Sequence, residues 1–352
     1  MTTRRALLRG LAAGLALGSL KLRSARAADA AAGAPYDGLA VDLHSHAGHL
    51  IRHNAAFAPV AAPMRAGGQS VLCLAIVADS PVTKVLPEGR IQQVRQPAPG
   101  ELAAWGEASF ERAHRLIAEQ GLAIVTTAAE LDAAAGGTPG VVVTSEGADF
   151  LDGQVARLED AYQRHRLRQL QLTHYRVNEL GDIQTESAVH DGLTDFGADV
   201  VRACNRLGIV VDVAHGTYEL VKRAVSVSTR PLVLSHTSLA EPPRSHSRLI
   251  SHQHARLIAS TGGVVGIWPA RFVFRDRAEF AAGVAHAVEV VGVDHVGIGT
   301  DMEGLPSGSV FDDYAELPAV VAALRATGLS AADVAKILGG NYRRVFAAVT
   351  AT

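Results

Sequence analysis

Apolar residues gather in short continuous runs along this chain, and amphipathic stretches of ten or more residues separate these runs. Most of the runs are rich in Val, Ile or Leu, which is typical of parallel strands that are buried on both faces. We expect a ninth, shorter strand at 122–127 to lie outside the main sheet. The eight main strands are expected at Leu39–His44, Val71–Ile76, Val141–Ser145, Arg168–Thr173, Ile209–Ala214, Pro231–Ser235, Gly263–Trp268 and His295–Gly299.

The alternation of strands and helices predicts the fold class. Eight β–α units in a chain of 352 residues favour a (β/α)8 TIM-type barrel. A doubly wound open sheet is the competing arrangement, but no glycine-rich phosphate loop follows the first strand. Two or three further helices are expected after the last strand, so the predicted fold is an α/β barrel with extra C-terminal helices.

The first 27 residues have the pattern of an export signal. Arg4 and Arg5 precede a short apolar segment, and a small-x-small cleavage motif ends at Ala27. Paired arginines ahead of a weakly apolar core are typical of a twin-arginine signal, and an uncleaved amphipathic helix is the alternative. We therefore expect residues 28–352 to form one domain that is periplasmic or secreted, without a stable membrane anchor once the signal is removed.

Composition and charge exclude several classes of function. The formal net charge is −2, so the sequence has no basic footprint for nucleic acid. Cys73 and Cys204 both lie in apolar or helical stretches. We interpret them as small core residues rather than as a disulfide or as zinc ligands.

Ionisable residues occur at the carboxyl ends of most of the expected strands. In a barrel of this kind, these ends converge on one rim, which carries the active site. A single polar residue at a strand end usually only marks the surface, but several imidazoles with a carboxylate on one rim predict a metal site. The residues are His44, His46, Glu146, His174, His215, His236 and Asp301.

The position of these residues around the ring suggests more than one metal ion. The pair His44 and His46 and the pair His215 and His236 come from opposite sides of the ring, which we expect to be too far apart for one tetrahedral ion. Two ions joined by a bridging anion would solve this problem. No lysine lies at a strand end, so a carboxylated lysine is excluded as the bridge, and Glu146 is the expected substitute.

Several longer motifs resemble the membrane dipeptidase (renal dipeptidase) family of metallopeptidases. They run in order from about residue 40 to residue 347 and include "SEGADFL", "LRQLQLTHYRVNELGD", "PLVLSHTS", "DHVGIGTDMEG" and "ILGGNYRRVF". The resemblance implies a TIM-type barrel with two Zn²⁺ ions that cleaves dipeptides, often with a D-residue at the C-terminal position. It also implies a homodimer.

The same resemblance implies roles for individual residues. His44 and His46 would bind the first zinc, His215 and His236 would bind the second, and Glu146 would bridge the two. Of the other residues, His174 would stabilise the oxyanion, Asp301 would handle the proton of the attacking water, and Arg248 would bind the carboxylate of the substrate. Tyr175 and Asn178 follow His174 and are expected to shape the substrate pocket.

His46 departs from the family pattern. The family usually has an aspartate at this position. Imidazole also binds zinc, but a site with histidine here has one negative charge fewer than a site with aspartate. This departure keeps open the alternative of another binuclear amidohydrolase acting on N-acyl amino acids or lactones. A non-catalytic metal or peptide binder is a further alternative, but the presence of both Glu146 and Asp301 argues against it.

Overall fold

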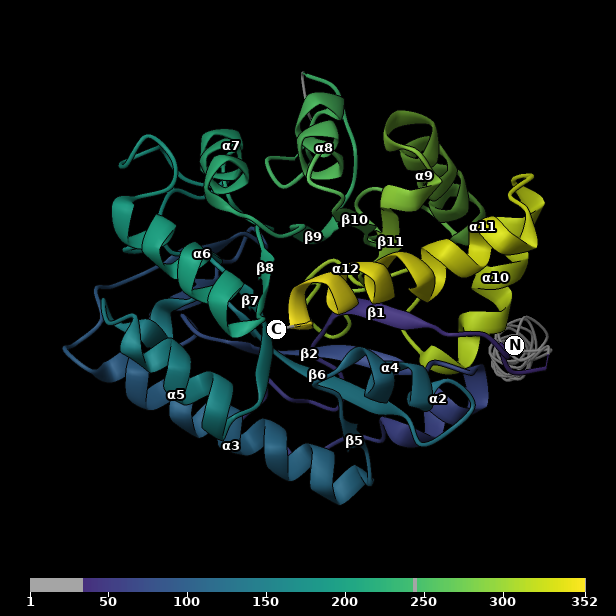
Figure 1. The fold of residues 1–352 in the computed structure, drawn as a ribbon, viewed down its shortest axis with the longest axis horizontal. Coiled ribbons are helices and arrows are strands. Elements are labelled where there is room, and N and C mark those ends of the chain that lie inside the picture. The colour runs from purple at the N-terminus through teal and green to yellow at the C-terminus, as the bar shows by residue number, and fades with distance from the viewer. Residues whose placement is uncertain (1–33, 243–245, 352) are drawn as a thin grey trace, which may run out of the picture.

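Eight parallel strands form the central barrel, as the sequence predicts (Figure 1). The computed structural model describes residues 34–242 and 246–351. All eight expected strands are confirmed, with end points that differ by a few residues. In their order around the ring they are β1 (Val41–Ser45), β2 (Val71–Val77), β6 (Gly140–Glu146), β7 (Leu167–Gln171), β8 (Val210–Asp212), β9 (Val233–Thr237), β10 (Val264–Ile267) and β11 (Val296–Ile298).

The ring closes where the end of β11 meets β1. The amide of Asp301 donates to the carbonyl of His44 at 2.9 Å, and the amide of His46 donates to the carbonyl of Met302 at 3.0 Å. Asp42 strengthens this junction, because its carboxylate accepts hydrogen bonds from the amide and the hydroxyl of Thr300 and from the hydroxyl of Tyr314. Asp42 therefore joins the first strand to the last.

Helices surround the barrel and connect successive strands (Figure 1). Thr194 caps the start of α6 by accepting a hydrogen bond from the amide of Gly197. The covering helices are α2 (Ala61–Gly67), α3 (Glu101–Gln120), α4 (Ala128–Ala134), α5 (Ala156–Arg164), α6 (Asp195–Leu207), α7 (Tyr218–Val227), α8 (His252–Ala259), α9 (Arg277–Val291) and α10 (Leu317–Ala326), with short 3-10 turns η1 (Asp149–Leu151), η2 (Val293–His295) and η3 (Tyr314–Glu316).

Two short strand features lie outside the ring. β5 (Ala123–Ile124) pairs only with β6, which confirms the extra strand expected at 122–127. A small antiparallel hairpin of β3 (Thr83–Val85) and β4 (Ile91–Gln93) follows β2 and was not predicted. Its three-residue strands are exposed or half-buried, so they carry no apolar run that would mark them in the sequence.

The last helical segments seal the amino-terminal end of the barrel. α11 (Ala331–Ala335), the π-helical segment η4 (Lys336–Gly340) and α12 (Asn341–Thr350) follow one another without a break, and α12 crosses the centre of the ring in Figure 1. Tyr342 and Phe346 of α12 pack in one apolar cluster with residues of six barrel strands. This end of the barrel is therefore closed, and the opposite end is left for chemistry.

Polar side chains form the layer above this apolar plug. The hydroxyl of Tyr342 donates to Gln169 at 2.8 Å, and the amide of Gln169 donates to the carbonyl of Leu43 and to the carboxylate of Asp212. These bonds connect α12 with the inner faces of β1, β7 and β8. They form the floor on which the site rests.

Three further expectations concern the ends of the chain and its cysteines. The segment expected to be an export signal, residues 1–27, lies outside the described residues. Within the described part of the chain, we find no helix that combines the length and the apolar character needed to cross a membrane. Cys73 and Cys204 are both buried and free, as expected.

Candidate metal centre

The predicted residues at the strand ends meet at one mouth of the barrel. His44 and His236 lie within β1 and β9, Glu146 is the last residue of β6, and His46 follows β1 directly. The other three each lie three residues beyond a strand: His174 after β7, His215 after β8 and Asp301 after β11. Placement at the carboxyl ends of successive parallel strands brings these distant residues together.

Glu146 lies at the centre of the group. Its Oε1 is 3.2 Å from His215 Nε2, 3.4 Å from His44 Nε2 and 3.5 Å from His236 Nε2. Its Oε2 is 3.2 Å from the Nε2 atoms of both His46 and His174. Five imidazoles therefore turn the same ring atom toward one buried carboxylate, which suits a carboxylate shared between metal positions.

The protein holds the opposite ring nitrogens of His46 and His236, whereas Nδ1 of His215 is buried without a hydrogen-bond partner among the described residues. His46 Nδ1 donates to the carbonyl of Ala75 at 2.7 Å, and His236 Nδ1 is hydrogen-bonded to the hydroxyl of Ser235 at 2.9 Å. A partner on Nδ1 fixes the orientation of the ring and directs the Nε2 lone pair toward a metal ion. The arrangement is therefore that of histidine ligands with outer-shell support.

Burial and neighbouring charges alter the titration of this group. Burial raises the pKa of Glu146, but the positive charges of His174 and His44 outweigh it, and the pKa lies well below its usual range. Burial holds the pKa values of His215 and His236 well below the usual range, so both rings are neutral and able to bind metal. For His46, burial is opposed by hydrogen bonds to Asp301 and Glu146, which raise its pKa to about 10 in the absence of metal.

The donor set fits one or more metal ions. Three overlapping groups place their ligand atoms within 4.8 Å of one another: His44, His46 and Asp301; His44, Glu146 and His236; and Glu146, His174 and His215. The Nε2 atoms of His44 and His46 are 3.2 Å apart, and those of His215 and His236 are 3.1 Å apart. Two nitrogen ligands of one tetrahedral Zn²⁺ lie about 3.3 Å apart, so both pairs suit this ion.

One geometric expectation is wrong. The two histidine pairs were expected to lie too far apart to share an ion, yet the ring centroids of His44 and His236 are only 4.1 Å apart. An eight-stranded barrel is just wide enough for side chains to fill, so long side chains from opposite strands meet at its centre. The separation of the pairs therefore does not determine the number of ions.

Asp79 is a site residue that the sequence analysis missed. It lies two residues after β2, is fully buried, and accepts hydrogen bonds from His174 Nδ1 at 2.7 Å and from the amide of Tyr175 at 3.0 Å. The carboxylates of Asp79 and Glu146 together raise the pKa of His174 against the opposing effect of burial. Its signal was the one used for the other strands, an ionisable residue just beyond a buried apolar run.

Arg248 lies beside the cluster and has no carboxylate partner among the residues that the structure describes. Its side chain is fully buried, bonds to Gln184 and to the carbonyl of His236, and lies over the ring of Trp268. Its Nε has no hydrogen-bond partner, and no ion pair within residues 34–242 and 246–351 includes it. A buried guanidinium in this state is suited to receive an anion.

Tyr175 and Asn178 differ in their placement. The ring of Tyr175 packs against those of His174 and His215, and burial raises its pKa to about 12. The side chain of Asn178 instead bonds to Asp149, to the carbonyl of Leu172 and to the amides of the following turn. The prediction that Asn178 contacts substrate is untested, and these bonds favour a role in shaping the loop.

The backbone at the mouth is strained where ligand atoms must be presented. His215 and Asp301 adopt left-handed conformations, with φ of 67° and 51°, which non-glycine residues rarely do. Gly304 lies against the same group, because a Cβ on it would be 2.0 Å from Asp301 Oδ1 and 2.7 Å from His46 Cδ2. The chain therefore leaves no room for a side chain at position 304.

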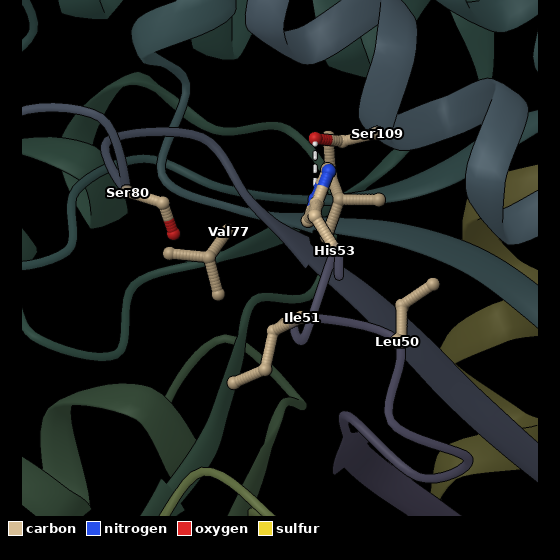
Figure 2. Close-up of a pocket in the computed structure, with 7 residues that line it drawn as sticks. Leu50, Ile51, His53, Val77, Ser80 and Ser109 are labelled. Carbon is tan, nitrogen blue, oxygen red and sulfur yellow. Dashed lines mark hydrogen bonds between the residues drawn. The ribbon is translucent and has the colours of Figure 1, made fainter. Parts of the chain in front are cut away.

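Figure 2 shows the side chains that line a narrow pocket, which has almost no room for a water molecule. Val77 lines it and pairs in register with Glu146, and His53 reaches Ser109 at 3.4 Å across it. The pocket therefore lies at the end of β2, where Asp79 follows. Its lining residues are Leu50, Ile51, His53, Ile76, Val77, Ser80 and Ser109.

A TIM-type barrel with buried His, Glu and Asp ligands at its mouth belongs to the class of barrel metalloenzymes. Within this class, the chain belongs to the membrane dipeptidase family (peptidase family M19), whose sequence profile matches residues 54–352. The match begins after His44 and His46, so it does not cover the position at which the sequence departs from the family pattern.

Curated relatives include two fungal dipeptidases. The chain is 33% identical to dipeptidase tcpJ of Claviceps purpurea (strain 20.1) over 190 residues, which cover 51% of this chain and 45% of the relative. It is 30% identical to dipeptidase verJ of Clonostachys rogersoniana over 189 residues, which cover 52% and 48%. The matched segments thus span about half the length of these relatives.

Solved structures confirm the fold at low sequence identity. The probable dipeptidase PvdM of Pseudomonas aeruginosa is 18% identical, with a TM-score of 0.76 over 89% of this chain and 96% of that one. A metallopeptidase of Rhodobacter sphaeroides, solved with a phosphinate mimic of the dipeptide L-Ala-D-Ala, is 20% identical. Its TM-score is 0.73 over 89% of this chain and 100% of that one.

Proposed function

We propose that this chain is a dipeptidase that hydrolyses the peptide bond of free dipeptides, using two zinc ions bridged by Glu146. The observation that carries the proposal is the convergence of five histidine Nε2 atoms on Glu146, within 3.5 Å, at the open end of the barrel. Membership of the membrane dipeptidase family and the similarity to named dipeptidases support it. The dipeptide mimic bound to the Rhodobacter sphaeroides protein supports L,D-dipeptides as one substrate class.

We assign one ion to His44 and His46 and the other to His215 and His236. Zinc ions bound in such a site activate water at neutral pH and polarise the carbonyl group that is attacked. The neutral state of His215 and His236 in the buried cluster suits ligation. Glu146 supplies the shared negative charge between the two positions.

Two residues at the mouth are suited to proton and charge transfer. His174 and Asp301 keep 7% and 8% of their surface exposed, more than the five proposed ligands, so substrate would approach from their side. We assign the proton of the attacking water, and its delivery to the leaving amine, to the Asp301 carboxylate. His174 donates a hydrogen bond from Nε2 to the carbonyl oxygen as negative charge develops on it.

Arg248 is proposed to select substrates with a free C-terminal carboxylate. Its buried guanidinium has an unpaired Nε and no carboxylate partner among the described residues, and it lies close to Tyr175. A bidentate arginine–carboxylate pair fixes the carboxyl end of the substrate. This contact favours substrates in which one residue with a free carboxylate follows the scissile bond.

The test is hydrolysis of a panel of L,L- and L,D-dipeptides by the zinc-replete protein, with the N-acetylated compounds alongside. Cleavage of the free dipeptides alone is the expected result. A Glu146→Gln variant that folds should lose both bound zinc and activity. Cleavage of only the blocked compounds or of lactones would replace this proposal by the amidohydrolase alternative, and no turnover of any compound would refute both.

We also propose that the chain is exported through its twin-arginine-type signal, so that the enzyme acts outside the cytoplasmic membrane. The support is the sequence pattern of residues 1–27 alone. Replacing Arg4 and Arg5 by lysine should retain the protein in the cytoplasm. Fractionation of producing cells measures this, and unchanged export would contradict the proposal.

A further inference from the structure

A third pair of facing histidines lies on the outer helices, away from the barrel mouth. His252 is the first residue of α8 and His286 lies on α9, and these helices are neighbours in the outer layer (Figure 1). Their Nε2 atoms are 3.1 Å apart, and their ring centroids are 5.1 Å apart. Neither residue belongs to the three groups of possible metal ligands at the barrel mouth.

This geometry repeats that of a pair within the metal centre. His215 and His236 have the same Nε2 separation of 3.1 Å and the same centroid separation of 5.1 Å. The angles between the rings are 66° for the inner pair and 59° for the outer pair. Since two nitrogen ligands of a tetrahedral ion lie about 3.3 Å apart, the outer pair is spaced to hold one ion.

A carboxylate lies near the Nδ1 atom of each of these two histidines. His252 Nδ1 is 3.3 Å from Glu241, and His286 Nδ1 is 3.5 Å from Glu289. Glu241 is itself held by the backbone amide of His252 at 2.8 Å. A carboxylate beside Nδ1 favours the tautomer with the proton on that nitrogen, which leaves the Nε2 lone pair free for a metal ion. With both rings in this tautomer, the two Nε2 atoms can bind one cation between them.

We propose that His252 and His286 form a surface site for one divalent transition-metal ion of the kind that imidazole prefers, such as Zn²⁺, Ni²⁺ or Cu²⁺. Glu241 and Glu289 orient the two ligands, and solvent fills the remaining coordination positions. The side chains of His252 and His286 are 25% and 48% exposed, so an ion reaches them from bulk water without passing through the barrel. The site is independent of the proposed dipeptidase activity.

The probe is Cu²⁺, which imidazole binds most tightly among these ions. One equivalent is added to the zinc-loaded full chain, and pulsed electron paramagnetic resonance counts the imidazole nitrogens bound to copper. We expect two imidazoles in the wild-type protein. In His286→Ala we expect loss of the two-imidazole signal and a dissociation constant at least about tenfold higher, because one of the two ligands is gone.

Two further variants make the result specific. His190 is an exposed histidine outside the pair, and His190→Ala should leave copper binding unchanged. Glu289→Gln should weaken binding about tenfold, because outer-shell partners contribute about this much to metal affinity. The same signal and affinity in wild type and His286→Ala would overturn the proposal, as would a failure of the wild type to bind copper. In either case the contact is a simple N–H···N hydrogen bond.

Discussion

Replacement of Asp79 tests whether the orientation of His174 contributes to turnover. Asp79 is the only partner found for His174 Nδ1 among the described residues, and its second oxygen holds the amide of Tyr175. Asp79→Ala removes both hydrogen bonds and leaves a buried Nδ1–H without an acceptor. His174 then loses the contact that points Nε2 at Glu146. We expect kcat to fall while the metal content stays unchanged.

The magnitude follows from the strength of the lost contacts. A hydrogen bond to a charged group contributes about 1.5–3 kcal/mol. Since about 1.4 kcal/mol corresponds to a tenfold change in rate, loss of the 2.7 Å bond to His174 should lower kcat by about 10- to 150-fold. KM should change less, because His174 is assigned to charge that develops only as the reaction proceeds. Asp79→Asn should retain part of the rate. Its single side-chain oxygen can replace one of the two carboxylate oxygens that accept from His174 Nδ1 and from the amide of Tyr175.

The assay is steady-state hydrolysis of the best free dipeptide, with bound zinc measured on the same samples. Ser80→Ala is the matched control, because Ser80 is the next residue and lines the neighbouring pocket (Figure 2). It should behave as wild type. An unchanged kcat in Asp79→Ala would refute the assignment of His174. A loss of activity that tracks loss of zinc would show that Asp79 supports the metal centre instead.

Three further outcomes are expected. Gly304→Ala should lower kcat about 100-fold at unchanged secondary structure, because its Cβ would displace Asp301 or His46 by about 1 Å; wild-type kcat would contradict this. Arg248→Met should raise KM for free dipeptides about 50-fold but leave turnover of dipeptide methyl esters unaltered, since about 2–3 kcal/mol of charged hydrogen bonding is lost; equal effects on both substrates would exclude carboxylate binding. In the metal-free chain, the pKa of His46 is raised from 6.5 to about 10, so its contribution to stability is complete below pH 6.5 and is lost as the pH rises through about 10. Thermal unfolding from pH 6 to 10.5 should show this loss without metal, and His46→Asp should abolish it.

The barrel could be predicted from the sequence because each of its strands is a continuous apolar run. Parallel strands covered by helices are buried on both faces, so they stand out from the polar connections even without an alignment. The β3–β4 hairpin could not be predicted in this way. Its residues are partly exposed, and the pairing of Thr83–Val85 with Ile91–Gln93 depends on the loop that joins them.

Most residues of the candidate site could be predicted from the sequence, but the distances between their side chains could not. The rule that barrel strands present their last residues at one rim brought His44, Glu146 and Asp301 together before the structure was known. Asp79 obeys the same rule, but it lies three residues beyond the end expected for the second strand, Ile76, so it was not counted as a strand-end residue. The pairing of His252 with His286 could not be predicted, since it depends on how α8 packs against α9 and on no local pattern.

The histidine at position 46 changes the charge balance of the metal centre. Its Nε2 lies 3.2 Å from Glu146 and 3.4 Å from Asp301, so it faces two carboxylates at once. An aspartate at this position would add a third carboxylate, and without metal the three would repel one another. A protonated His46 instead donates to one of these carboxylates and attracts both. Because the pKa of His46 is raised to about 10, metal uptake must displace its proton, and the affinity of the site for metal should rise with pH up to about 10.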